Sequence, residues 1–185
     1  HDIDIGVLEN KTYRIVLPII LKKRGFKEVK KTFLKDDGML KFIKKGGREV
    51  DINFYKINKK NKTAFVKWYI PKNLLMRSID VLSFSKKYRG NFYKLINFFG
   101  FSENFFLTLK KILVSKNLFY SHAGYSHKKD YACKLKKYNF NGLKVNVPLS
   151  YKNYLEDLYG KRWRVPIKKY NWIKHSPSTI LFNKK

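Results

Sequence analysis

Acidic and apolar residues alternate strictly over the first six residues of the chain. Side chains of a β-strand point to opposite faces in turn, so this segment predicts a strand with Asp2 and Asp4 on one face and Ile3 and Ile5 on the other. We expect the isoleucines to be buried and the carboxylates, about 7 Å apart along the strand, to face open space. Because two such anions repel each other, a divalent cation between them is the expected partner. The pattern indicates a Mg²⁺ (or Mn²⁺) site that handles phosphates.

The same alternation returns at 49–55, where Asp51 is flanked by Val50 and Ile52. The apolar residues predict a buried strand face, and Asp51 then lies on the opposite face. A carboxylate on a neighbouring strand would complete the oxygen shell of a metal or take a proton from an attacking hydroxyl. The simpler alternative for Asp51 is an exposed residue of the sheet face, paired with a lysine.

Helix and turn signals place one helix and several strands in the first half of the chain. A helix over 11–24 is expected to end at Gly25, with Pro18 kinking it or beginning its second part. The longest apolar run, 15–21, is far shorter than the ~18 residues of a membrane span and predicts a buried helix. Turn residues between short extended pieces predict a mixed or antiparallel sheet, with pieces at 26–33, 39–44, 49–56 and 63–69.

The middle of the chain has a different pattern. Phe105, Leu109, Ile112 and Leu113 recur at helical spacing, and 91–99 is rich in aromatic residues. We therefore predict a mostly helical insertion over 71–140, packed on the sheet. A basic amphipathic helix that lies on a membrane or holds an acceptor is the alternative. With 185 residues and 44 % hydrophobic content, one α+β domain spanning 1–185 is expected.

The formal charge of +29 suggests a nucleic-acid-binding module. Only seven of the 42 basic residues are arginine, however, and the lysines are spread along almost the whole chain. Phosphate recognition favours the bidentate arginine fork, so we expect a solvated lysine surface and no nucleic-acid partner. A basic nucleic-acid-binding module remains the alternative, as does attraction to an anionic membrane surface.

The single cysteine, Cys133, excludes an internal disulfide framework and fits a reducing compartment. Together with His122 and His127 it could contribute to a zinc site. Three possible ligands with loose spacing and no fourth nearby make that pattern weak.

A carboxy-terminal block combines a short helix with a cationic loop. Ser150 is a suitable N-cap, the apolar residues of 151–158 recur at helical spacing, and Gly160 ends the helix. The loop that follows could bind a nucleotide by stacking and phosphate contacts. Its candidate substrate-binding residues are Lys161, Arg162, Trp163 and Arg164. Alternatively, Trp163 and Trp172 only attach the C-terminus to the core.

These motifs resemble the LicD/fukutin family of phosphotransferases. The likeness rests on two blocks: the opening strand with Val50-Asp51-Ile52, and Val145-Asn146-Val147-Pro148 continuing through Tyr159-Gly160-Lys161-Arg162-Trp163 to Trp172. The second block is more similar to fukutin than to the bacterial choline-phosphate enzymes. About half of the chain is covered. The glycine-rich segment that leads into the metal strand in this family is missing here, so we expect an N-terminally truncated domain.

The resemblance implies a polymerase-β-like nucleotidyltransferase core that moves ribitol phosphate or phosphocholine from a CDP-activated donor to a hydroxyl of a glycan or glycoprotein. By position, Asp2 and Asp4 match the family's metal-binding pair and Asp51 its third carboxylate. A eukaryotic member would be expected in the Golgi lumen and a bacterial one in the cytoplasm. A nucleotidyltransferase acting on RNA or a small molecule would share the three carboxylates and is the alternative enzyme.

Overall fold

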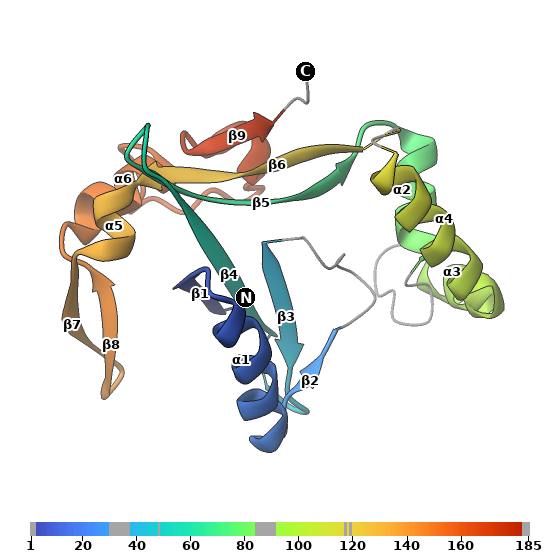
Figure 1. Ribbon diagram of the computed structural model, residues 1–185, viewed down its shortest axis with the longest axis horizontal. Coiled ribbons are helices and arrows are strands. Elements are labelled where there is room, and N and C mark those ends of the chain that lie inside the picture. The colour runs from blue at the N-terminus through green and yellow to red at the C-terminus, as the bar shows by residue number, and fades with distance from the viewer. Residues whose placement is uncertain are drawn as a thin grey trace.

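The computed structural model describes residues 3–29, 38–47, 49–83, 92–116, 118 and 120–182 (Figure 1). It is a mixed α+β protein whose main sheet has seven strands. Their bounds are β1 Ile3–Leu8, β2 Lys27–Glu28, β3 Met39–Ile43, β4 Glu49–Asn58, β5 Thr63–Pro71, β6 Tyr120–Lys128 and β9 Thr179–Phe182. The α+β class and the mixed sheet expected from the sequence are confirmed.

The long strand β4 joins the two halves of the sheet. Its first half pairs with β3 in antiparallel and with β1 in parallel orientation, and its last residues pair with β5. Beyond β5 the order continues through β6 to β9. The opening strand is therefore a direct neighbour of the strand that carries Asp51.

The first core lies between β4 and helix α1 (Lys11–Lys23). The alternation predicted for β4 is confirmed, because Val50, Ile52 and Phe54 are buried together with Phe42 of β3. Leu17 and Leu21 of α1 pack against them. The side chain of Asn10 caps α1 by accepting a hydrogen bond from the Thr12 amide at 2.8 Å.

Two expectations about burial near the N-terminus are wrong. Ile3 and Ile5 are 49 % and 44 % exposed, because β1 has β4 as its one neighbour among the described strands and Val7 is the residue of β1 that packs against the core. The apolar run 15–21 is helical, as expected, but Ile15 and Ile19 are 64 % and 49 % exposed. Only one side of α1 meets the core.

A helical unit lies at one end of the molecule (Figure 1). It consists of α2 (Leu74–Leu82), α3 (Tyr93–Phe98), the 3₁₀ helix η2 (Phe99–Ser102) and α4 (Glu103–Ser115). Met76 and Ile79 of α2 and Val114 of α4 form its own small core, against which Tyr69 of β5 packs. Most described residues of 74–115 are thus helical, as expected. The expectation of a mostly helical segment is wrong for 120–140, because 120–128 enter the main sheet as β6 and 135–140 form a further strand.

The carboxy-terminal part lies at the opposite end from α2–α4 (Figure 1). It contains α5 (Lys129–Cys133), the hairpin of β7 (Leu135–Phe140) and β8 (Leu143–Pro148), α6 (Tyr151–Tyr159) and α7 (Trp172–His175). The helix predicted after Ser150 is confirmed, and Gly160 ends it with a φ of 85° that favours glycine. None of the described helices is long and apolar enough to span a membrane.

Candidate metal site on strands β1 and β4

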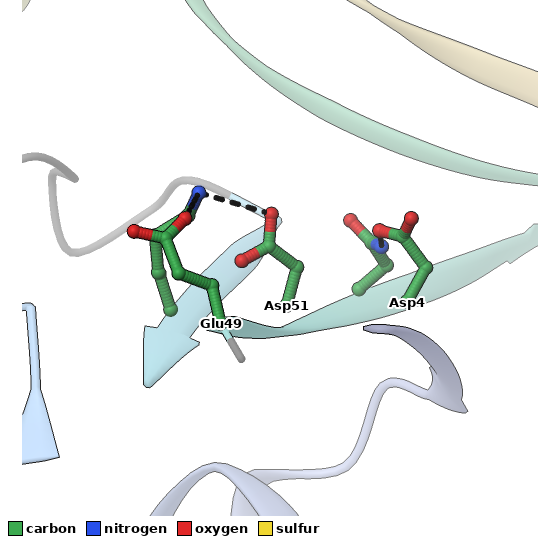
Figure 2. A network of polar contacts seen from close by, with 5 residues as sticks. Asp4, Glu49 and Asp51 are labelled. Atoms are coloured by element: carbon green, nitrogen blue, oxygen red, sulfur yellow. Dashed lines mark hydrogen bonds and ion pairs between the residues drawn. The ribbon is translucent and has the colours of Figure 1, made fainter. Parts of the chain in front are cut away.

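Asp4 and Asp51 lie side by side in the structure. They are register partners of the parallel β1–β4 pair, so their Cα atoms are separated by one strand spacing, about 4.8 Å. Figure 2 shows both carboxylates on the same side of the two strands. Asp51 is 6 % exposed, whereas Asp4 is exposed. Residues 47 positions apart are therefore close enough to share one cation.

Two further polar side chains extend this row of carboxylates. The Asn53 side-chain amide donates a hydrogen bond to Oδ1 of Asp4 at 3.2 Å. On the other side, Lys41 Nζ lies 2.8 Å from Glu49 Oε2 and 3.4 Å from Asp51 Oδ2 (Figure 2). Burial lowers the pKa of Lys41, but the hydrogen bond to Glu49 and the charge of Asp51 outweigh this effect and raise it. The raised pKa keeps Lys41 a cation, which forms ion pairs with both Glu49 and Asp51.

The oxygen donors suit a hard divalent cation, but the described residues do not complete a ligand set. Asp4, Asp51 and the amide oxygen of Asn53 are the ligand types that Mg²⁺ prefers. Asp2, the other predicted ligand, lies outside the described residues. Within the described part of the chain, no group of three or more His, Cys, Asp or Glu side chains gathers around one point. A complete site would need a further ligand, and Asp2 remains the predicted one.

Three tyrosines from different elements lie near enough to Asp4 for its charge to act on them. They are Tyr55 of β4, Tyr125 of β6 and Tyr154 of α6, and the hydroxyls of Tyr55 and Tyr154 share a hydrogen bond. Burial is the main cause that raises the pKa of each tyrosine, to about 12 for Tyr154, and the negative charge of Asp4 adds to it in all three. Helix α6, which belongs to the carboxy-terminal block, therefore lies near β1, which belongs to the N-terminal block.

His127 of β6 is enclosed by the same three rings. Its ring centroid lies 5.9 Å from that of Tyr55, 6.0 Å from Tyr125 and 5.1 Å from Tyr154. The residue is 5 % exposed, and neither ring nitrogen has a hydrogen-bond partner among the described residues. Burial lowers its pKa to about 4, against the charge of Asp157, which raises it. His127 is therefore a neutral, buried group at the back of the site.

The described side chains do not form the zinc site that the sequence allows at His122, His127 and Cys133. His127 is enclosed in the aromatic cluster, Cys133 is exposed, and the side chain of His122 lies outside the described part. No metal-ligating group forms among the described residues near them.

The four loop residues predicted to bind substrate follow α6 directly. Lys161, Arg162 and Arg164 are exposed, and the Arg164 guanidinium lies 4.2 Å over the ring of Trp163. The loop begins next to Tyr159, whose charge raises the pKa values of Tyr125 and Tyr154. It thus starts beside the aromatic cluster, with its cations directed to solvent.

The two tryptophans of the block have different surroundings. The ring of Trp172 lies 5.1 Å from that of Trp68 and 5.4 Å from that of Tyr125, so it does attach the C-terminus to the sheet. Trp163 instead stacks with Arg164 of its own loop.

Several residues of the site were not predicted. Tyr55 continues the alternation of Asp51 and Asn53 on β4, so extending that pattern by two residues would have found it. Lys41 and Tyr154 carry no such signal, because they reach the site through the pairing of β3 and the packing of α6.

The enclosed histidine makes the stability of the protein depend on pH. The folded-state pKa of about 4 lies below the ordinary 6.5, so between these values the unfolded chain binds a proton that the folded chain does not. Stability is then lost as the pH falls from about 6.5 toward about 4, by up to roughly 3 kcal/mol from this group.

We expect His127→Phe to remove this part of the pH dependence, since a ring of similar shape without nitrogens fits the same cage. The measurement is the free energy of unfolding in urea at about pH 7 and about pH 4.5. His175→Phe, at an exposed histidine of α7, is the control. An equal drop in stability between the two pH values for wild type and His127→Phe would contradict the assignment.

Comparisons of the chain with protein-family models, with curated proteins and with solved structures found no match.

Proposed function

We propose that this chain is a metal-dependent phosphotransferase with a polymerase-β-like nucleotidyltransferase core. The observation that carries the proposal is the pairing of Asp4 with Asp51 on adjacent parallel strands. A helix directly after the first acidic strand and a second acidic strand beside it are consistent with that core. A basic nucleic-acid-binding module would give no reason for two carboxylates to meet within one strand spacing.

The proposed substrate is a CDP-activated alcohol phosphate, with ribitol phosphate or phosphocholine as the transferred group and a glycan hydroxyl as the acceptor. This part rests on the resemblance of the two sequence blocks to the LicD/fukutin family. Its structural support is that α6 brings Tyr154 of the second block close to Asp4 of the first. Two blocks at opposite ends of the chain therefore contribute to one region.

In the proposed mechanism, Asp2, Asp4 and Asp51 would hold Mg²⁺ or Mn²⁺, which would supply positive charge to the donor pyrophosphate. The ion pair with Lys41 holds the Asp51 carboxylate in place, and in this mechanism Asp51 orients the acceptor hydroxyl and accepts its proton. The acceptor oxygen forms a bond to the distal phosphorus, and the bond from that phosphorus to the bridging oxygen breaks. The released CMP takes the electron pair.

The remaining residues bind the donor. Lys161, Arg162 and Arg164 are exposed cations that can contact the phosphates, and Trp163 offers a ring face for the cytosine. Tyr55, Tyr125 and Tyr154, which feel the charge of Asp4, would line the side of the donor site next to it.

The test is to incubate the intact protein with CDP-ribitol, CDP-choline or CDP-glycerol, each with Mg²⁺ and separately with EDTA, and to follow CMP by chromatography. We expect CMP from at least one donor, and only when Mg²⁺ is present. CMP release that continues in EDTA would contradict the metal site. Failure of all three donors, combined with nucleotide addition to RNA, would favour the alternative nucleotidyltransferase.

A further inference from the structure

A cluster of large apolar side chains is exposed at the far end of the helical unit. We call it the phenylalanine tip, and its members, with their exposed fractions, are Phe92 (79 %), Leu95 (60 %), Phe98 (73 %), Phe99 (40 %), Phe101 (78 %) and Phe105 (65 %). Three of the rings contact one another. The centroids of Phe98 and Phe99 are 5.7 Å apart, those of Phe98 and Phe101 6.5 Å, and those of Phe99 and Phe101 6.3 Å. These three rings form a continuous apolar group where α3 passes into η2, and the other members lie on the adjoining residues of the chain.

The phenylalanine tip is not a part of the core of the helical unit. The residues of α4 that recur at helical spacing toward α2 are Phe106, Leu109 and Leu113, and they pack on the buried Met76 and Ile79. Phe105 and Ile112 lie on the other side of α4 and are exposed. In Figure 1, α3 projects away from the main sheet. Exposed apolar clusters of this kind mark interaction surfaces.

The exposed charged side chains of the helical unit that carries the tip have one sign. In the described stretches 72–83 and 92–116, every exposed charged side chain is basic, and these residues are Lys72, Arg77, Lys94, Lys111 and Lys116. The two acidic residues of these stretches are not available, because Glu103 is 1 % exposed and Asp80 is in an ion pair with Lys110. The described part of the helical unit therefore carries exposed aromatic rings and exposed basic side chains, without an exposed acidic side chain.

We propose that the phenylalanine tip docks this protein onto an anionic lipid bilayer. The interface of a bilayer offers an apolar layer for the rings and negative head groups for the lysines, which is the pair of features that the tip needs. A second copy of the chain fits poorly, since each copy carries a net charge of +29. A nucleic acid would attract the lysines but would leave Leu95 and much of the ring area without an apolar partner. The proposal is independent of the proposed function.

The test measures co-sedimentation of the full chain with sucrose-loaded vesicles of phosphatidylcholine, with and without phosphatidylserine. We expect binding that requires phosphatidylserine and weakens as salt is added, because the lysines act through screened charge. The double variant Phe98→Ser/Phe101→Ser is expected to bind at least about tenfold more weakly, since two exposed rings no longer enter the interface. Both rings are exposed, so the fold should persist, which circular dichroism checks.

The matched control is Phe140→Ser/Leu143→Ser on the β7–β8 hairpin, where the side chains are 59 % and 66 % exposed. It loses a similar apolar area away from the tip and should bind as wild type does. The proposal is overturned if wild type does not bind, or if both double variants bind equally, as pure charge attraction would predict. It is also overturned if the tip variant mainly abolishes self-association in sedimentation without lipid.

Discussion

Replacing Asp4 with asparagine is expected to lower the rate of CMP release from the CDP-activated donor at least about a thousandfold, and Asp51→Asn should do the same. Each change removes one negative oxygen from the pair that faces the same side of β1 and β4 (Figure 2). The amide keeps the size and shape of the side chain. The loss should therefore appear in turnover, while circular dichroism changes little. The urea midpoint should stay near that of wild type for the exposed Asp4 and fall for Asp51, whose buried ion pair with Lys41 is weakened.

The control for this series is Asp130→Asn. Asp130 is exposed on α5 and is paired with Lys134 at 2.7 Å, so the same chemical change there should leave turnover unaltered. Normal turnover of Asp4→Asn in the intact protein would show that the metal-dependent mechanism is wrong. A second readout is the Mg²⁺ concentration for half-maximal rate, which should rise in any variant that keeps measurable activity.

The largest effect on stability is expected from Phe54→Ala. Phe54 is fully buried on β4, and the Arg14 guanidinium of α1 lies 4.5 Å over its ring, so the side chain joins the sheet to the helix. Truncation leaves a cavity in the core formed with Phe42, Val50 and Ile52. We expect a loss of about 3–5 kcal/mol in the free energy of unfolding.

The comparison for Phe54→Ala is Phe101→Ala, at a ring that is 78 % exposed, where the change should stay within about 0.5 kcal/mol. Urea unfolding followed by circular dichroism measures both variants. A cost below about 1 kcal/mol for Phe54→Ala would mean that the β4–α1 core is not the main source of stability.

Local patterns predicted a good part of the fold. The alternation at 49–55 placed Val50, Ile52 and Phe54 on the core face of β4, as the structure has them. Helix α6 was predicted with its end at Gly160, because apolar spacing and a residue that tolerates positive φ are local properties. Burial was harder. Ile3 and Ile5 are half exposed, since alternation distinguishes the faces of a strand but does not say which face is covered.

The contacts within the candidate site join segments that are distant in the sequence, so local patterns do not predict them. Asp4 and Asp51 were recognised as carboxylates on strands, but their pairing depends on the β1–β4 register, which many separate hydrogen bonds determine together. The sequence allows His127 to be a zinc ligand. Only the packing of β4, β6 and α6 shows that three tyrosines enclose it. Lys41 reaches Asp51 because β3 is the antiparallel neighbour of β4.

By itself, the sequence determined the strand at 49–56 and the helices at 11–24 and 151–159 with their apolar faces, because backbone geometry repeats every two residues in a strand and about every 3.6 in a helix. It did not determine the strands at 120–128 and 135–140, which it placed in a mostly helical insertion. Only the tertiary structure decided which of these faces meet. It brought Asp4 beside Asp51, enclosed His127 among three tyrosines and left the phenylalanine tip uncovered. The reason is that contacts between distant segments depend on the packing and hydrogen bonding of the whole chain, and no short pattern of residues encodes them.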